Sequence, residues 1–256
     1  MERVNTLHKQ RYYRNYTYNN FDLVRFEVEY YESNLLICAK KNLKKHAQEW
    51  LIYFHQQVNG YLEKNPLFKA SLCAVEIDES APEIIIAMAK AGQKADLGPM
   101  AAVAGAIAEF VGKKLLSFSD EIIVENGGDI FIAVKKQRRI GIFAGAGNIY
   151  NRLAIKLSAF DTPCGICASS GKFGHSLSFG KADILVVLAK STLVADAFAT
   201  SIGNQISQVD DVSRVLDTVK SSKFIQGVIA VVGDKLTVYG NIELDILKPI
   251  TFEDTI

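Results

Sequence analysis

The segment from residue 183 to residue 189, DILVVLA, most constrains the fold, because beyond its first residue it is apolar at every position. A strand with one solvated face would carry a polar residue at every second position. The pattern therefore predicts an interior strand with both faces covered. With 256 residues, 49% of them hydrophobic and 22% charged, the chain can build a large core of this kind.

The remaining expected elements come in groups of strands and helices rather than in strict alternation. Strands are expected at 21–28, 33–39, 121–125, 130–134, 139–144, 152–157 and 165–168, with a hairpin over 227–239. Helices are expected at 43–62, 82–90, 100–116 and 209–220, and the helix that carries Asp196 is expected to end near 203–204. This order predicts an α+β fold in which antiparallel sheets pack against helices. No linker interrupts the composition, so we expect one domain, 1–256, or two intimately packed halves, 1–117 and 118–256.

Charge and cysteine content exclude several classes of protein. The 29 basic and 28 acidic residues give a net charge of +1, which argues against nucleic acid or an anionic membrane as partner. No apolar run has the length of a signal-peptide core or of a membrane span, and four scattered cysteines fit a reducing compartment. We therefore expect a soluble cytoplasmic protein whose ligand is a small molecule or another protein.

Asp196 and Thr200 are the first candidate site. They lie four residues apart in the apolar stretch VADAFAT, so a helix would place a carboxylate and a hydroxyl on one face. Such oxygens suit a hard cation such as Mg²⁺ bridging to a phosphate. The alternative is a buried Asp bonded to backbone, with Thr200 bonding back into its own helix, and the spacing leaves both interpretations open.

A second candidate is the polar loop that begins at Ser169, Ser170 and Gly171 and reaches His175. It could present N–H groups, hydroxyls and an imidazole to a phosphate, or it could be an ordinary surface turn. Residues 126–129, NGGD, call for a tight hairpin turn between two strands.

Two further patterns concern packing. The helix expected at 100–116 opens with small residues, including Ala101 and Gly105, so another backbone or a flat ligand could approach it closely. Close packing of this helix on a sheet is the default explanation. Cys164 and Cys167 form a C-x-x-C pattern, but on a strand they face opposite sides, which favours structural cysteines over a redox or zinc site.

Taken together, these motifs resemble the ApbE superfamily, whose characterised members are magnesium-dependent FAD:protein FMN transferases with a T-fold-like α+β architecture. Residues 195–200 match the family's A-D-A-x-A-T helix in full, and 126–129 is similar to its N-x-G-G-D hairpin. Residues 96–102 echo its D-x-G-G-x-A-K-G stretch, and Ser169 to Gly171 with His175 resemble its serine, glycine and histidine segment. The chain resembles more closely an uncharacterised branch of that superfamily.

The resemblance implies roles for particular residues and ligands. Asp196 and Thr200, with the backbone carbonyl of Ala101, would hold Mg²⁺, and His175 would be catalytic. The cofactor, FAD or FMN, would contact a set of residues comprising Gly128, Asp129, Ser169, Ser170 and Gly171. A protein acceptor would receive FMN if transfer occurs, and the resemblance leaves the oligomeric state open.

Departures from the family pattern define the competing hypothesis. Ala102 stands where the transferases have lysine, and His175 is followed by SLSFGK instead of completing H-x-x-D-P-x-T-G. Losing groups that position a phosphoryl transfer could abolish the reaction and leave binding intact. The alternative function is accordingly a non-catalytic binding or assembly module that keeps the fold.

Overall fold

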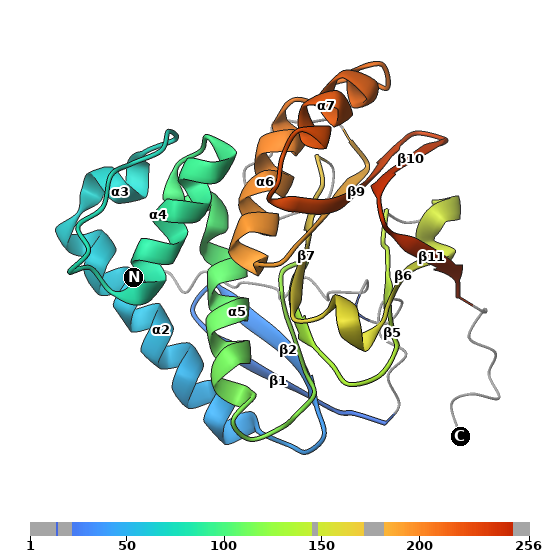
Figure 1. The fold of residues 1–256 in the computed structure, drawn as a ribbon. Helices are drawn as coiled ribbons and strands as arrows, with labels where there is room; N and C mark the ends of the chain where they lie inside the picture. The colour runs from blue at the N-terminus through green and yellow to red at the C-terminus, as the bar shows by residue number, and fades with distance from the viewer. Residues whose placement is uncertain (1–13, 15–21, 145–147, 172–181, 248–256) are drawn as a thin grey trace, which may run out of the picture.

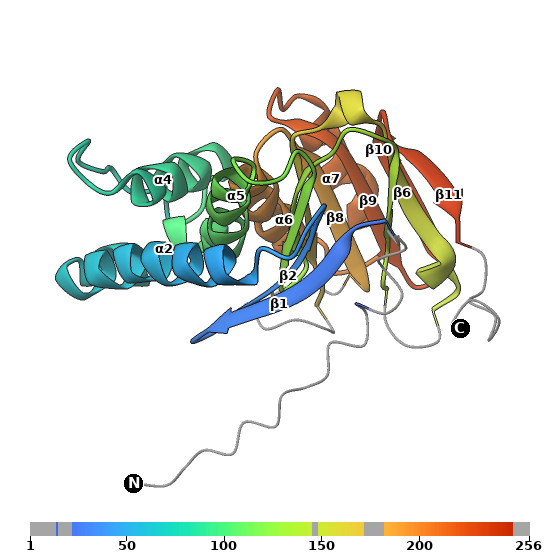
Figure 2. The same cartoon turned by 90° about the horizontal axis from the view of Figure 1, so that it is seen from below.

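The computed structural model describes residue 14 and residues 22–144, 148–171 and 182–247. These residues form three layers: a group of helices, an eight-stranded antiparallel sheet and a three-stranded antiparallel sheet (Figures 1 and 2). The large sheet lies between the other two layers. The predicted α+β class with antiparallel sheets is confirmed.

The large sheet has the order β1-β2-β3-β4-β7-β8-β9-β10, and every neighbouring pair is antiparallel. Its strands are β1 (Val24–Tyr30), β2 (Ser33–Ala39), β3 (Ile122–Asn126), β4 (Asp129–Ala133), β7 (Cys164–Ser169), β8 (Ile184–Ala189), β9 (Ile225–Val232) and β10 (Lys235–Gly240). The small sheet has the order β11-β6-β5, with β5 (Arg138–Gly141), β6 (Leu153–Leu157) and β11 (Glu243–Ile246). Because β2 pairs with β3, the N-terminal strands belong to the same sheet as the later ones.

The helical layer covers the opposite face of the large sheet from the small sheet (Figure 2). The described helices are α2 (Lys44–Lys64), α3 (Pro66–Ala70), α4 (Glu83–Ala95), α5 (Val103–Leu115), α6 (Thr192–Asn204) and α7 (Asp211–Lys220), with short 3₁₀ turns η1 (Pro99–Ala102), η2 (Ile149–Arg152) and η3 (Ala159–Asp161). Of these, none alone is long and apolar enough to cross a bilayer; 83–95 and 99–115 meet that test only together and bend by 105° between them.

Strand β8 shows why its sequence is apolar throughout. Leu185 and Val187 lie in the core between the large sheet and the helices. Ile184, Val186 and Leu188 lie in the second core, between the two sheets. The interior position predicted for this strand is therefore confirmed, and its two faces are buried by different layers.

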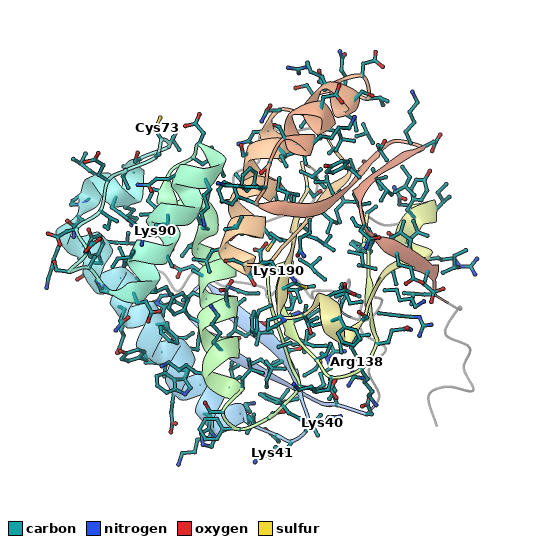
Figure 3. All side chains as sticks on the ribbon, in the orientation of Figure 1. Lys40, Lys41, Cys73, Lys90, Arg138 and Lys190 are labelled. Atoms are coloured by element: carbon teal, nitrogen blue, oxygen red, sulfur yellow. The ribbon has the colours of Figure 1, made fainter. Side chains whose placement is uncertain are left out.

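An ion-pair cluster joins the two sheets at one end of β2 (Figure 3). Arg138, at the start of β5, donates to Glu121 at 2.5 and 3.1 Å and to Asp22 at 2.5 and 3.2 Å. Lys40 lies 2.6 Å from Glu121. Hydrogen bonds from Arg138 and Lys136 lower the pKa of Asp22 below its ordinary value. Since Arg138 and Glu121 are only 4% and 2% exposed, these charges depend on one another for compensation.

Several element boundaries differ from those predicted. The helix expected at 82–90 continues to Ala95, and Asp96 then ends it in the left-handed conformation with φ 53°. The helix expected at 100–116 begins as the 3₁₀ turn η1 and becomes α-helical at Val103. The tight turn at 126–129 is confirmed, with φ of 70° at Gly127 and 109° at Gly128.

Candidate functional site

Helices α5 and α6 pack side by side in antiparallel register, and each holds the start of the other. Glu109 of α5 accepts hydrogen bonds from the Thr192 backbone N–H (2.5 Å) and the Ser191 hydroxyl (3.0 Å) at the start of α6. In return, Asp196 of α6 accepts a hydrogen bond from the Gly105 backbone N–H at 2.8 Å. The first N–H groups of a helix have no partner within it, so each carboxylate serves as a cap supplied by the neighbouring helix.

Gly105 allows this close approach. A Cβ built at Gly105 would lie 2.7 Å from the Thr192 carbonyl oxygen and 2.9 Å from the Asp196 Cβ. No side chain fits there unless the helices separate. The expected close approach to the small residues of 100–116 is confirmed, but at Gly105 the approaching backbone is that of helix α6 rather than a sheet.

The Asp196 carboxylate is in an environment that opposes its charge. Burial raises the pKa of Asp196 to about 7, although the hydrogen bond from Gly105 acts in the opposite direction. Within the part of the chain that the structure describes, no Lys or Arg forms an ion pair with it. Some of Asp196 remains open to solvent. The carboxylate therefore has one backbone donor and no cationic partner among these residues.

A second buried carboxylate, Asp129, lies in the same region. It begins β4 and is opposite Cys167 of β7 in the strand register. The pKa of Asp129 is raised well above its ordinary value, first by burial and then by the negative charge of Asp196; a hydrogen bond with Cys167 partly offsets this. The Cys167 thiol is itself buried, lies 3.3 Å from the Thr192 carbonyl oxygen, and has a raised pKa. Asp129, Cys167 and Asp196 thus form one cluster between β4, β7 and α6.

The proposed metal ligands lie on neighbouring elements. The contacts between 109 and 192 and between 105 and 196 define the antiparallel register of α5 and α6. The turn η1, which contains Ala101, precedes α5 and also contacts α6, which carries Asp196 and Thr200. Asp196, Thr200 and Ala101 are all partly exposed.

The proposed cofactor-binding residues are placed less uniformly. Ser169 is buried against α6, since a Cβ at Gly203 would lie 3.1 Å from its hydroxyl oxygen. The Ser170 hydroxyl donates to the Asp183 carbonyl at 2.7 Å, and the Gly171 N–H donates to Ala182 at 3.1 Å. Ser169 therefore belongs to the α6 side of the sheet, whereas the polar groups of Ser170 and Gly171 are engaged with backbone.

The hairpin at 126–129 is also anchored. The Gly128 N–H donates to Glu125 at 2.8 Å, and the Asn126 side chain donates to the Ala104 carbonyl, just inside α5, at 3.1 Å. The hairpin is thereby tied to the start of α5, beside Asp196. His175 lies outside the described residues.

Sequence reasoning missed three participants: Gly105 as hydrogen-bond donor, Glu109 as a cap and Cys167 as a neighbour of both aspartates. Glu109 carries a sequence signal, because a glutamate within an alanine-rich apolar helix needs a partner. The role of Cys167 depends on strand register, which the sequence does not show. Cys167 lies in the core between the large sheet and the helices, and Cys164 lies in the core between the two sheets. This confirms that the two cysteines of the C-x-x-C pair face opposite sides of β7. Both are free thiols.

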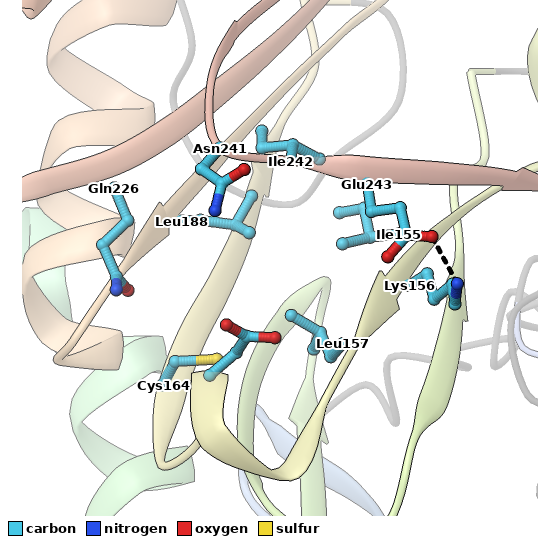
Figure 4. A pocket seen from close by; sticks show the side chains of 10 residues that line it. Ile155, Lys156, Leu157, Cys164, Leu188, Gln226, Asn241, Ile242 and Glu243 are labelled. Carbon is cyan, nitrogen blue, oxygen red and sulfur yellow. Dashed lines mark hydrogen bonds and ion pairs between the residues drawn. The ribbon is translucent and has the colours of Figure 1, made fainter.

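A separate pocket lies on the opposite face of the large sheet, toward the small sheet (Figure 4). Its apolar wall includes Leu188 and Cys164, and its polar rim includes Lys156 paired with Glu243. It shares no lining residue with the aspartate cluster.

Among the described residues, no group of three or more His, Cys, Asp and Glu side chains has a metal-binding arrangement. A cation near Asp196 would therefore rely on hydroxyl, carbonyl, water or ligand oxygens as well.

Comparisons with known proteins agree with this architecture. The model of the family described as AbpE bacteria matches residues 15–232. A UPF0280 protein of Methanocaldococcus jannaschii is 40% identical over 217 residues, covering 82% of this chain and 88% of that protein. A UPF0280 protein of Methanobrevibacter smithii is 37% identical over 201 residues, covering 76% and 84%.

Solved structures share the fold at low sequence identity. The ApbE protein of Thermotoga maritima superposes with a TM-score of 0.57 at 13% identity, covering 88% of this chain and 97% of that one. The apo form of the flavinyl transferase ApbE of Pseudomonas stutzeri gives 0.52 at 12% identity, covering 85% and 94%. The chain therefore has an ApbE-like fold and belongs to the AbpE bacteria family, with UPF0280 proteins among its relatives.

Proposed function

We propose that this protein binds a flavin nucleotide, or a related phosphorylated nucleotide, together with a divalent cation beside Asp196. The observation that carries this proposal is the environment of the Asp196 carboxylate. Burial raises its pKa to about 7, and it has no cationic partner among the described residues. A bound cation would supply the missing positive charge. The fold shared with a flavinyl transferase supports flavin as the ligand class.

The donors that surround Asp196 fit Mg²⁺. A carboxylate, the hydroxyl of Thr200 and the carbonyl of Ala101 are all hard oxygen donors, and Mg²⁺ commonly keeps waters and phosphate oxygens in its remaining positions. All three residues are partly exposed, as contact with a hydrated ion requires. Bound there, the ion would neutralise charge on a diphosphate.

The protein's own groups would orient the site. The Gly105 N–H holds one carboxylate oxygen of Asp196, and Glu109 holds the start of the helix that carries it. Asp129, whose raised pKa favours the protonated form, could donate a hydrogen bond to a ligand where an ionised carboxylate would repel it. Gly128 and Ser169 would shape the wall beside the ligand.

Transfer of FMN is the finer version of this proposal. An acceptor hydroxyl would attack the FMN phosphorus of FAD and release its proton to solvent, a phosphoester bond would form, the diphosphate bond would break, and AMP would leave. Ala102 in place of the transferases' lysine favours the second candidate, a binding or assembly module without transfer activity. We therefore propose nucleotide binding as the primary function, with His175 as the residue to test for catalysis.

A thermal-shift experiment separates the two candidates. The full-length protein is heated with FAD, FMN or ATP, each with Mg²⁺ or with EDTA. Binding predicts a rise in Tm that requires Mg²⁺ and that Asp196→Asn loses. Asn keeps an oxygen acceptor for Gly105 but removes the charge. The control is Asp120→Asn, at an exposed aspartate outside the site. No shift with any nucleotide would contradict the binding proposal and favour the module.

A further inference from the structure

The hairpin that leads into Asp129 is held by a buried glutamate. Gly127 and Gly128 both have positive φ. Because glycine has no Cβ, an unrestrained pair of glycines can adopt many other backbone conformations. Glu125 provides the restraint, because one carboxylate oxygen accepts the Gly128 N–H at 2.8 Å. Asp129 follows directly, so the position of its carboxylate beside Asp196 depends on this turn.

Glu125 depends in turn on Arg14. Glu125 is only 1% exposed, and its second oxygen lies 2.6 Å from both Nε and Nη2 of Arg14. Arg14 is 3% exposed, and its guanidinium also donates to the side chain and the carbonyl of Asn34 at 2.7 and 2.9 Å. Both guanidinium nitrogens contact Oε2, which leaves Oε1 to accept the Gly128 N–H. Hydrogen bonds between ionised groups are stronger than those between neutral ones.

This contact lies on the face of the large sheet away from α6. Side chains alternate along a strand, so Glu125 shares its face with Ile123, which belongs to the core between the two sheets. Arg14 therefore acts from behind the sheet, 111 residues away in sequence from its partner. Among the described residues, Arg14 contacts none of the groups proposed to bind ligand, so its effect on those groups must pass through Glu125 and the hairpin.

We propose that Arg14 is a positioning residue for the nucleotide site: it keeps Glu125 oriented, Glu125 holds Gly128, and the hairpin then presents Asp129 to Asp196. The link from this relay of contacts, Arg14 to Glu125 to Gly128, to nucleotide binding rests on the proposed function. The relay of contacts is independent of it. Without the guanidinium, the Glu125 side chain loses the contact that fixes one of its oxygens, and its other oxygen is held less firmly against the Gly128 N–H.

Amide hydrogen exchange tests the relay in the absence of any ligand. In full-length Arg14→Ala, exchange at 127–129 should rise by about ten-fold or more, while β8 and β9 keep the wild-type rates. The control is Arg25→Ala, an exposed arginine on β1, which should change neither region. Unchanged exchange at the hairpin, or an equal rise in every strand, would overturn the proposal, because the latter is what general destabilisation produces.

Flavin affinity tests the functional consequence. With Mg²⁺ present, Arg14→Ala should weaken FAD binding by about five- to ten-fold, which corresponds to about 1 kcal/mol. Glu125→Gln keeps an acceptor for Gly128 without a charge, so adding Arg14→Ala to Glu125→Gln should have little further effect. Additive effects would refute the relay. Failure of the wild type to bind FAD would instead contradict the proposed function, and the exchange pattern would still decide the role of Arg14.

Discussion

The Asp196 carboxylate accepts the backbone N–H of Gly105 at 2.8 Å, across 91 residues of sequence. This bond joins the start of α5 to the second turn of α6 and aims one carboxylate oxygen at helix α5. A helix N-terminus favours a negative charge, whereas burial opposes it. Burial has the larger effect, since the pKa of Asp196 is raised to about 7.

Replacing Gly105 should separate the two helices. In Gly105→Ala the new Cβ would meet the Thr192 carbonyl at 2.7 Å, and we expect a loss of about 1 to 3 kcal/mol in the free energy of unfolding. Gly60→Ala is the matched control, because a Cβ there meets nothing within 4 Å and alanine favours helix. Urea unfolding measures both. A Gly105→Ala protein as stable as wild type would contradict the packing described.

Asp196 should make stability depend on pH. The pKa of Asp196 in the folded protein, about 7, lies above its value in the unfolded chain, so the folded state binds the proton more tightly. As pH rises from about 4 to 7, Asp196 therefore lowers the free energy of unfolding. Without metal, Asp196→Asn should be more stable than wild type at pH 8 by about 1 to 3 kcal/mol, and the difference should shrink toward pH 5. Denaturant unfolding in EDTA at both pH values measures it. A wild type that gains stability relative to Asp196→Asn as pH rises would contradict this sign.

The buried ion cluster should be far more sensitive than an exposed ion pair. Arg138→Met leaves Glu121 and Asp22 without their guanidinium partner, and we expect a loss of about 3 to 5 kcal/mol. Arg139→Met is the control, since Arg139 pairs with Asp245 at the surface and should contribute about 0 to 1 kcal/mol. Urea midpoints compare the two variants. Equal losses of stability in the two variants would contradict the claim that burial makes the contacts of Arg138 more important than those of Arg139.

Thiol reactivity should separate Cys73 from the other cysteines. Cys73 is exposed, whereas burial raises the pKa of Cys38 to about 11 and that of Cys164 to about 12. Only the thiolate reacts readily, so native protein treated with a thiol reagent at pH 8 should be modified quickly at Cys73 alone. Mass spectrometry identifies the modified residue. Rapid modification of Cys164 in the folded protein would contradict its burial.

The sequence predicted those elements whose signals are local. The apolar run in β8, the turn residues at 126–129 and the end of α6 near Gly203 were each predicted, because periodicity and turn chemistry act over a few residues. The end of α4 was predicted too early. Its last turn is terminated by Asp96 in a left-handed conformation that aspartate adopts only when its surroundings favour it.

The arrangement of the site could be predicted only in part. Asp196 and Thr200 were identified from helical spacing, and the metal-binding role assigned to them remains a prediction. The contacts of Asp196 with Gly105 and of Glu125 with Arg14 join residues about a hundred positions apart, so they follow from strand order and helix packing. A single sequence contains no local signal for either.

Calorimetric titration of FAD into the full-length protein, with Mg²⁺ and then with EDTA, tests the central claim most directly when Asp196→Asn is measured beside the wild type. The account predicts saturable binding by the wild type with Mg²⁺, and at least about ten-fold weaker binding both in EDTA and in Asp196→Asn. Binding that is equally tight in all three cases, or absent from the wild type, would contradict a cation-dependent nucleotide site at Asp196.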